Sequence, residues 1–410
     1  MSERLPTGWT VAPLGDLARI YSGGTPSRGV PAYWGGGIPW VTTAEIDAGF
    51  VASAREKITE AGLKASAARI APPGTLLLAM YGQGKTRGKV ALLQIPAAMN
   101  QACAAIEVGK KLDGRYLLFY LASRYEEIRS MSNAGSQENL SGDLVRRIPI
   151  AYPSIHVQRE IAALLGDADD LTVKLEQLIA KKEAIKQGVM QQLLTGEHRL
   201  AGWDHSRLSD LIDGLEAGVS VRSSELTSNG VAVLKTSAVS NGRFDPTEAK
   251  PVLSMDIGRV RCNPVAGSLI ISRMNTPALV GEVAYVERNY ENLYLPDRLW
   301  LARARRSGHM RVNMRWLGYY LSSGPGSRAV RDLATGTSGS MKNIPKERLL
   351  ALTIPTPPSC EQDRIAEVVC DVEHEIDLLC RQLSKARDVK QGMTQRLIGR
   401  TRLSLKESVA

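Results

Sequence analysis

Apolar residues in segment 158–194 recur at the spacing of one face of a helix. The steps between them are three, four or seven positions, for Leu164, Ala168, Leu171, Leu175, Leu178, Ile185 and Val189. This periodicity predicts a long helix that packs along a second helix with coiled-coil character, although Lys182 interrupts the stripe. A helix of roughly 40 residues would be about 60 Å long. Because it cannot bury its own apolar face, we expect its partner elsewhere in the chain.

A second copy of this segment begins near Gln362 and aligns with the first without a gap. The aligned pairs include Gln158 with Gln362, Ile161 with Ile365, Asp167 with Asp371, Lys181 with Lys385 and Lys186 with Lys390. Its apolar stripe is weaker, because Glu375 and Gln382 fall at seam positions. Ser359 followed by Gln362 predicts a capping box at the start of this helix. Gapless identity of this extent favours two related helices that pack together over two unrelated surface helices.

The segments that precede the two helices also repeat. The first contains β-rich runs, IPWVT at 38–42, TLLLAM at 75–80 and GKVALLQI at 88–95, then RYLLFYLAS at 115–123 and the polar loop GSQENL at 135–140. The second contains the counterparts GVAVLKTSAV at 230–239, GSLIIS at 267–272 and RWLGYYLSS at 315–323. We therefore predict an α+β fold with an internal pseudo-twofold repeat, in which each of two β-rich domains is followed by a long helix. The predicted bounds are 1–153 and 201–357 for the domains, and 154–200 and 358–410 for the helices.

The composition of the chain indicates what kind of partner it binds. The chain has 410 residues, of which 43% are hydrophobic and 23% charged, and its formal net charge is +10. Such a charge favours a polyanionic partner, nucleic acid first. No run of 18 apolar residues and no apolar N-terminal leader occur in the sequence, so we expect neither a membrane span nor a signal peptide. The five cysteines include no CxxC pair, which is typical of a reduced, cytoplasmic protein.

The two β-rich segments differ most in the loops between matched strands. A duplicated scaffold with two dissimilar loop sets suits a protein that reads two different sequences at a fixed separation. Base edges are read mainly by Arg, Lys, Asn and Gln, whereas Lys, Arg, Ser and Thr also bind phosphates. The loop residues that we expect to contact DNA are Tyr81, Gln83, Lys85, Thr86, Arg87 and Lys89 in the first segment, and Lys235, Arg273, Asn275 and Thr276 in the second. For any one of them, a solvated loop side chain is the alternative.

Together these features resemble the specificity subunit of type I restriction-modification systems. The resemblance rests on LPTGW at 5–9 with LGDL at 14–17, SGGTPS at 22–27, YWGGGIPWVT at 33–42, the GSQENL loop, and the repeated helix that contains QREIA and ends at KQGVMQQLLTGEHRL and KQGMTQRLIGRTRL. It covers nearly the whole chain, in order. It implies two target-recognition domains, each reading one half of a split double-stranded DNA site in the major groove, with an antiparallel helix pair as the spacer. The second domain departs most from the pattern, at residues 215–220.

The same resemblance implies partner subunits and their cofactors. The helices would dock two modification subunits, which bring S-adenosylmethionine and methylate adenine N6. Restriction-translocase subunits, which bring ATP and Mg²⁺, would join for cleavage. This chain itself would need no cofactor and no metal. The helix residues expected to contact partner subunits are Gln158, Ile161, Leu164, Leu171, Gln362, Ile365 and Val368.

Catalysis by this chain finds no support in its motifs. An adenine methyltransferase needs (Asp/Asn)-Pro-Pro-aromatic, and the nearest strings, APPG at 71–74 and NPV at 263–265, lack that combination. The string AMYGQGKT at 79–86 fits a relaxed Walker A pattern, but a strand-like run follows where a phosphate-binding loop needs a helix. We therefore expect a non-catalytic DNA-reading adaptor. The alternative is a non-catalytic coiled-coil scaffold or a non-specific nucleic-acid-binding protein.

Overall fold

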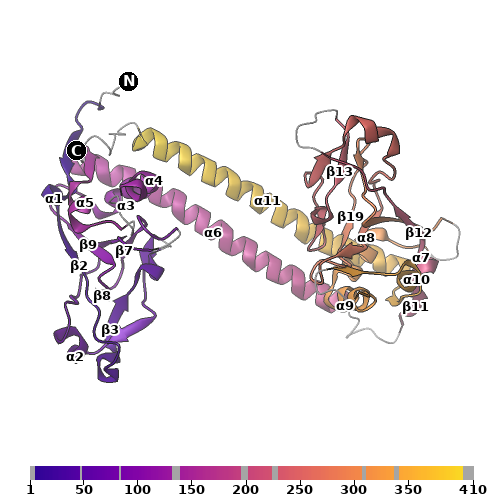
Figure 1. Cartoon of the computed structure of the whole chain (residues 1–410), viewed down its shortest axis with the longest axis horizontal. Coiled ribbons are helices and arrows are strands. Elements are labelled where there is room, and N and C mark those ends of the chain that lie inside the picture. Colours follow the sequence, from indigo (N-terminus) through magenta and orange to yellow (C-terminus); the bar gives the residue numbers. More distant parts are fainter. Residues whose placement is uncertain are drawn as a thin grey trace. The chain divides into compact units, whose positions relative to one another are not determined.

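The computed structural model describes residues 5–46, 49–82, 85–131, 139–194, 202–223, 230–306, 311–336 and 341–399 (Figure 1). The chain divides into two compact units. Unit 1 combines Met1–Glu176 with Arg381–Ala410, and unit 2 is Gln177–Cys380. Each unit holds one β-rich domain and one half of each long helix. The division therefore keeps each domain together with the helix halves that support it.

Unit 1 is built on a main sheet with strand order β2-β9-β6-β7-β4. Its strands are β2 (Ala18–Ser22), β4 (Phe50–Val51), β6 (Leu76–Ala79), β7 (Val90–Leu93) and β9 (Cys103–Val108). A smaller sheet joins β3 (Trp34–Val41) to β5 (Glu56–Ile58) and β8 (Ala98–Met99), and β1 (Thr10–Pro13) pairs with β10 (Pro149–Tyr152). The short helices are α1 (Leu14–Leu17), α2 (Glu60–Lys64), α3 (Gly114–Ser123), α4 (Tyr125–Ser130) and α5 (Gly142–Arg147).

Both faces of this main sheet are buried. Leu76 and Leu78 of β6 belong to the hydrophobic cluster that contains α3, whereas Leu77 and Ala79 belong to a second cluster. All four side chains are fully buried. Successive residues of a strand point to opposite faces, so the apolar run of β6 fills the core on both sides. The sheet is thus a fixed layer, and loops project from its strand ends.

Unit 2 repeats this plan. Its main sheet has the order β12-β21-β17-β19, formed by β12 (Ile212–Ala217), β17 (Leu269–Ser272), β19 (Val283–Tyr285) and β21 (Leu299–Ala304). The other strands are β11 (Asp204–Arg207), β13 (Ala232–Leu234), β14 (Val239–Ser240), β15 (Arg243–Phe244), β16 (Ala249–Pro251), β18 (Met274–Asn275), β20 (Leu293–Tyr294), β22 (Lys342–Asn343) and β23 (Thr353–Thr356). Its short helices are α7 (Leu208–Leu211), α8 (Met314–Ser322), α9 (Gly324–Asp332) and α10 (Lys346–Leu350). The sheet alignments reproduce the repeat predicted from sequence.

The long helices α6 (Ile155–Leu194) and α11 (Ser359–Leu397) pack together in both units. Ion pairs connect them, Asp169–Lys390 and Glu176–Arg387 in unit 1, and Lys182–Glu375 and Lys186–Glu373 in unit 2. In each unit the residue number rises along α6 as its partner's number falls along α11, so the helices are antiparallel. The predicted α+β fold class with packed long helices is confirmed.

The apolar stripe predicted as the helix seam is partly wrong. Leu164, Leu171, Leu178 and Ile185 are between 40% and 51% exposed. Ala168, Leu175 and Val189, also predicted at the seam, are half-buried as expected. At the other seam positions the inward residue comes one place later along α6, at Leu165, Thr172, Ile179 and Lys186.

Two of the residues in the observed seam are polar, so an apolar pattern in the sequence does not show this seam. Thr172 donates a hydrogen bond from its hydroxyl to the carbonyl of Asp169 at 2.8 Å, so it can be buried within the helix. Lys186 reaches the carboxylate of Glu373 on α11. Apolar neighbours at 164–165 and at 178–179 allow two seams one residue apart, and periodicity alone does not choose between them.

A buried glutamine joins the start of α6 to the β-rich domain of unit 1. The side-chain oxygen of Gln158 accepts a hydrogen bond from the backbone N–H of Asp113 at 2.8 Å. Its amide nitrogen donates to the carbonyls of Lys111 and Pro153, both at 2.9 Å. Gln158 is 0% exposed. We call this arrangement the glutamine latch, and it fixes α6 to the segment just before α3.

The aligned glutamine of α11 makes the same latch in unit 2. Gln362 accepts from the backbone N–H of Asn313 at 2.8 Å and donates to the carbonyl of Pro357 at 2.9 Å. The capping box predicted for Ser359 and Gln362 is wrong, because Ser359 already lies within α11 and the backbone N–H of Gln362 donates to the carbonyl of Pro358 at 3.0 Å. The latch is a duplicated joint between helix and domain.

The cysteines differ in environment, and we expect their reactivity to follow it. Burial raises the pKa of Cys103 to about 12, whereas Cys360 and Cys380 are exposed. Because the thiolate is the reacting form, iodoacetamide at pH 8 should modify Cys360 and Cys380 at least tenfold faster than Cys103. Peptide mass spectrometry measures the rates, with urea-unfolded chain as the control in which all react. Equal rates in the folded chain would contradict this packing.

None of the helices in the described part of the chain has the combined length and apolar character of a membrane span.

Candidate nucleic-acid interface

The strand ends of unit 1 gather at one edge of its main sheet. β2 runs antiparallel to β9 with Ser22 opposite Ala104, and β6 runs antiparallel to β9 with Ala79 opposite Cys103. The chain therefore leaves β2 and β6 and enters β9 at the same edge. We call the described residues there, 23–28, 80–82, 85–89 and 100–102, the unit 1 rim.

Hydrogen bonds tie these rim segments to one another. The backbone N–H of Met80 donates to the carbonyl of Ala102 at 2.8 Å, and the N–H of Leu140, from the GSQENL loop, donates to the carbonyl of Met80 at 3.0 Å. The side chains of Thr25 and Gln101 are hydrogen-bonded. The segments after β2, after β6 and before β9 thus form one connected surface.

The predicted DNA-contacting residues of unit 1 differ in how far their side chains are exposed to solvent. Tyr81 and Lys85 are exposed, and Thr86 and Lys89 are half-buried. Arg87 is only 7% exposed, so its side chain is packed within the rim, and DNA contact by Arg87 stays a prediction. Gln83 lies outside the described residues. The stretch that matched a relaxed Walker A pattern lies between β6 and β7, so its Lys and Thr do not begin a helix.

Unit 2 has a corresponding rim. Ala217 of β12 lies opposite Trp300 of β21, and Ser272 of β17 lies opposite Leu299. We call residues 218–223, 273–282 and 296–298 the unit 2 rim. Its central backbone hydrogen bonds repeat those of unit 1, with Arg273 at the position equivalent to Met80. The N–H of Arg273 donates to the carbonyl of Arg298 at 3.0 Å, and the N–H of Ile344 donates to the carbonyl of Arg273 at 3.0 Å.

A tightly packed glycine begins each rim. A Cβ on Gly23 would lie 2.1 Å from the carbonyl oxygen of Met99, and one on Gly218 would lie 1.6 Å from that of Leu295. Only glycine fits at either place. Gly218 is the counterpart of Gly23, with the alignment displaced by one residue, because β12 carries a register shift between Ile212 and Leu215. This irregularity displaces the alignment of residues 215–220 with the first unit by one position.

The predicted DNA-contacting residues of unit 2 also differ in how far their side chains are exposed to solvent. Arg273 is half-buried, donates from Nε to Asn343 at 3.2 Å and lies over the Trp300 ring. Thr276 is exposed, whereas Asn275 is 8% exposed and uses its amide to accept from the Thr276 N–H at 2.9 Å. The amide of Asn275 therefore shapes the loop, and its contact with a base stays a prediction.

Lys235 lies outside the unit 2 rim. It follows β13 in the smaller sheet, and its ammonium group is 3.5 Å from a carboxylate oxygen of Glu248.

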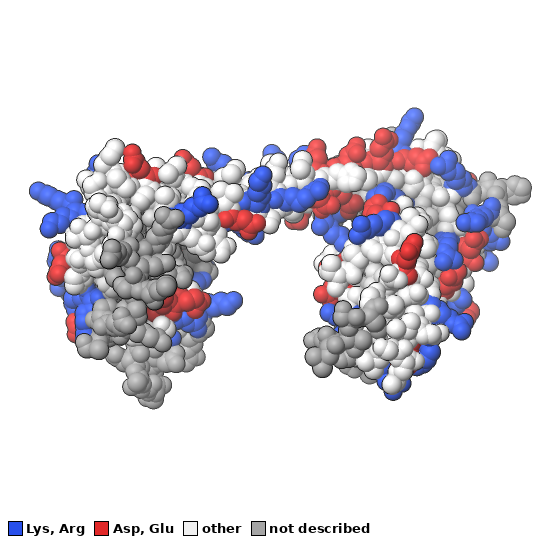
Figure 2. All heavy atoms as spheres, turned by 90° about the horizontal axis from the view of Figure 1, so that it is seen from above, with Lys and Arg blue, Asp and Glu red and all other residues white. Residues whose placement is uncertain are grey.

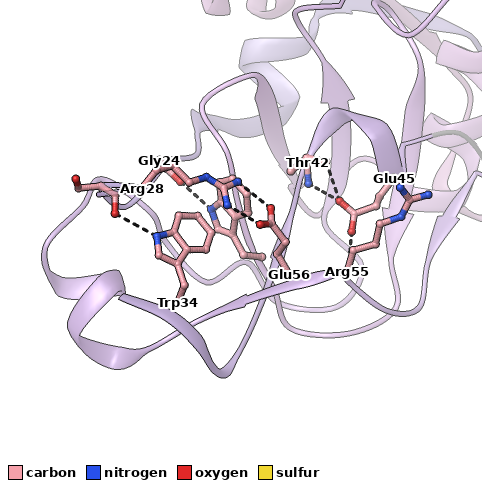
Figure 3. A network of polar contacts seen from close by, with 9 residues as sticks. Gly24, Arg28, Trp34, Thr42, Glu45, Arg55 and Glu56 are labelled. Carbon is pink, nitrogen blue, oxygen red and sulfur yellow. Dashed lines mark hydrogen bonds and ion pairs between the residues drawn. The ribbon is translucent and has the colours of Figure 1, made fainter. Parts of the chain in front are cut away.

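Sequence reasoning missed an arginine in the unit 1 rim (Figure 3). Arg28 donates from Nη1 and Nη2 to the two carboxylate oxygens of Glu56, at 2.5 and 2.8 Å. Its guanidinium lies 3.8 Å from the centroid of the Trp34 ring. Hydrogen bonding from Arg28 lowers the pKa of the Glu56 carboxyl, so this carboxylate is ionised at neutral pH. Trp40 steadies the segment by donating to the carbonyl of Gly24 at 2.9 Å.

Unit 2 contains a similar arginine that was also missed. The backbone N–H and Nε of Arg222 both donate to Asp256, at 3.0 and 3.2 Å, and Arg259 donates to the other carboxylate oxygen at 3.0 Å. The side chain of Asp256 is 3% exposed. The bonds from Arg222 hold its carboxyl pKa well below the usual range. Arg259 also donates to the carbonyl of Ser220 at 3.5 Å, which ties this cluster to the segment after β12.

The net positive charge is not gathered into one area on the face drawn in Figure 2. There, Lys and Arg side chains are interspersed with Asp and Glu on the described surface of each unit. On this face, the formal net charge therefore does not by itself mark a DNA-binding surface.

The helix residues predicted to contact partner subunits fall into two groups. Gln158, Ile161, Gln362 and Ile365 are at most 5% exposed and are packed within their own units. Leu164, Leu171 and Val368 are 49%, 51% and 44% exposed. Exposed side chains are the better placed for contact with another subunit, and partner contact stays a prediction for both groups.

Comparison with known proteins shows which class the chain resembles. Residues 6–187 match the family model described as Type I restriction modification DNA specificity domain. The chain is 31% identical over 173 residues to the type I restriction enzyme MjaIX specificity subunit of Methanocaldococcus jannaschii, an alignment that covers 41% of this chain and 39% of that relative. In that alignment the chain spans about two fifths of the relative's length.

Other matches extend over the whole chain. The MjaVIII specificity subunit of the same organism is 23% identical over 98% of this chain and 94% of its own length. The crystal structure of a type I restriction-modification system S subunit from M. genitalium has the same fold, with a TM-score of 0.63, 12% identity and coverage of 96% and 97% of the two chains. Over nearly its whole length the chain is therefore similar in sequence to specificity subunits of type I restriction-modification systems, and residues 6–187 match the model of their DNA specificity domain.

Proposed function

We propose that this chain reads a bipartite double-stranded DNA site for a type I restriction-modification complex, with one half-site bound at each rim. The observation that carries this proposal is the duplication of one rim architecture with different side chains. Met80 and Arg273 occupy equivalent backbone positions with the same hydrogen-bonding pattern. The exposed side chains that follow them differ, with Tyr81 and Lys85 in unit 1 and Thr276 in unit 2. Equivalent surfaces with different chemistry suit the reading of two different sequences.

The proposal assigns the chemistry to partner subunits. Two modification subunits dock on the outward faces of the long helices, which carry Leu164, Leu171 and Val368. They bring S-adenosylmethionine and methylate adenine, and restriction-translocase subunits bring ATP and Mg²⁺. The chain itself binds no cofactor or metal and acts as a non-catalytic adaptor in the cytoplasm. An exposed apolar stripe is what a helix-docking partner needs.

Salt dependence and competition test the proposal against a scaffold or a non-specific binder. The complex of this chain with its modification subunit should bind its own site at least about a thousandfold more tightly than random duplex at physiological salt. Its affinity should fall steeply as salt rises, because phosphate contacts release counterions. A steep salt slope with equal affinity for every sequence would establish a non-specific binder. Absence of DNA binding by an assembled complex would favour the scaffold.

Changes in one rim should damage recognition of one half-site only. Replacing both Tyr81 and Lys85 by Ala removes two exposed side chains of the unit 1 rim, and should weaken selection of one half-site about tenfold or more. Arg273→Ala should do the same to the other half-site. Lys110→Ala is the control, because Lys110 is exposed beyond the far end of β9. Binding to substituted sites measures the effect, and equal losses at both half-sites would show that these residues make only general contacts.

A further inference from the structure

Each rim carries an exposed arginine whose position is restrained by a carboxylate, and we call Arg28 and Arg222 the held arginines. Arg28 follows β2 in unit 1 and Arg222 follows β12 in unit 2, in both cases shortly after the glycine that begins the rim. Their carboxylate partners come from different elements: Glu56 lies in β5, and Asp256 lies in the 3-10 helix η4 (Ser254–Arg259). The same arrangement is thus built twice from different parts of the sequence.

The held arginine of unit 1 has a fixed plane and an accessible edge. Two hydrogen bonds to Glu56 and the contact with the Trp34 ring restrain the guanidinium. The Arg28 side chain is nevertheless 55% exposed. The two bonds to Glu56 use one N–H of each Nη, so Nε–H and an outer Nη–H remain as a pair of parallel donors.

The held arginine of unit 2 is restrained less. Its Nε and backbone N–H share one oxygen of Asp256, and Nη2 contacts the Met255 sulfur at 2.9 Å. The Arg222 side chain is 67% exposed. Asp256 also binds Arg259, so this cluster has two guanidinium groups for one carboxylate and keeps a positive charge.

Both arginines lie in the segments proposed to face DNA. Thr25, in the same segment as Arg28, is bonded to Gln101 in the turn before β9. A planar guanidinium with two parallel donors matches the O6 and N7 acceptors of guanine in the major groove. A neighbouring carboxylate that fixes the guanidinium reduces the side-chain freedom lost on binding. Lysine offers neither the plane nor the paired donors.

We propose that Arg28 and Arg222 are guanine-reading residues, one for each half-site, with Glu56 and Asp256 as their positioning residues. This inference rests on the proposed function, because it requires each rim to face the major groove. It assigns a G·C pair to the half-site read by each unit. The preference for that pair is stronger in the unit 1 half-site, where the guanidinium is restrained on two sides.

The test is methylation of a randomised DNA library by the complex with its modification subunit, followed by sequencing of methylated molecules. Arg28→Ala should reduce selection for one guanine in one half-site by about tenfold or more, and should leave the other half-site unchanged. Arg28→Lys should lose the same selection despite its charge. Glu56→Gln should keep guanine as the preferred base with weaker selection. Arg222→Ala should give the mirror result.

Arg19→Ala is the matched control. Arg19 is 68% exposed and lies in β2, where it is paired with Glu107 of β9, away from the unit 1 rim. It should change neither half-site. If Arg28→Ala abolishes methylation, sequencing of library DNA captured by the same complex gives the base preferences directly. Full guanine selection by Arg28→Ala, or a unit 1 half-site with no required guanine, would overturn the inference. A wild-type complex with no bipartite site would instead overturn the proposed function.

Discussion

Lengthening both long helices by seven residues should change the gap of the recognised DNA site and neither of its halves. The insertion duplicates one heptad of α6 after Ile179 and one of α11 after Leu379, two half-buried positions in unit 2. Seven residues of helix are about 10 Å long, the span of about three base-pair steps. Methylation of the original site should fall by about a thousandfold or more, towards the non-specific level. A site with a gap longer by up to about three base pairs should replace it.

Paired insertion is required because the helices hold each other in register. Lys182 and Lys186 of α6 bind Glu375 and Glu373 of α11. Inserting the heptad in α6 alone is the control, since it separates these ion pairs and should lower the melting temperature. Sequencing of methylated library DNA reads out both variants. Altered bases within a half-site, with the original gap kept, would show that the helices do not set the spacing.

Removing a glutamine latch should be among the most destabilising single changes in the chain. Gln158→Leu leaves the N–H of Asp113 and the carbonyls of Lys111 and Pro153 without their buried partner. Each buried group left unsatisfied costs about 1–3 kcal/mol, so the loss should be about 3 kcal/mol or more. Gln362→Leu should cost less, about 2 kcal/mol or more, because Gln362 serves one donor and one acceptor.

Urea unfolding together with amide hydrogen exchange measures these losses. The amide of Asp113 should exchange faster in Gln158→Leu, and that of Asn313 should exchange faster in Gln362→Leu. Gln187→Leu is the matched control, because Gln187 is exposed on α6. If Gln158→Leu were no less stable than this control, the latch would contribute nothing to the joint between helix and domain.

Features set by local pattern and repetition could be predicted from the sequence. The duplication, the two long helices and the strands at 75–80 and 88–95 follow from gapless alignment and from apolar runs. The seam of α6 could not be predicted in full, because a leucine occurs at both 164 and 165 and the observed inward face also uses Thr172 and Lys186. Their burial depends on a hydrogen bond within the helix and on Glu373, and periodicity does not show either.

The candidate site was predictable as a set of loops but not side chain by side chain. Residue type suggested Arg87 and Asn275, and the fold buries both. It did not suggest Arg28, although an arginine directly follows the Gly-rich SGGTPS segment. What distinguishes Arg28 is Glu56, which β5 brings to it from another part of the chain. Such long-range partners appear only when the fold is known.

Mapping of adenine methylation tests the central claim most directly. DNA would be sequenced by a single-molecule method from cells that carry this chain with its modification subunit, and again after unit 2's β-rich domain is exchanged for that of a relative. The account predicts a split motif, two short half-sites separated by an unspecified gap, of which the exchange alters one half only. A single continuous motif, or no methylation from a complex shown to be assembled, would contradict it.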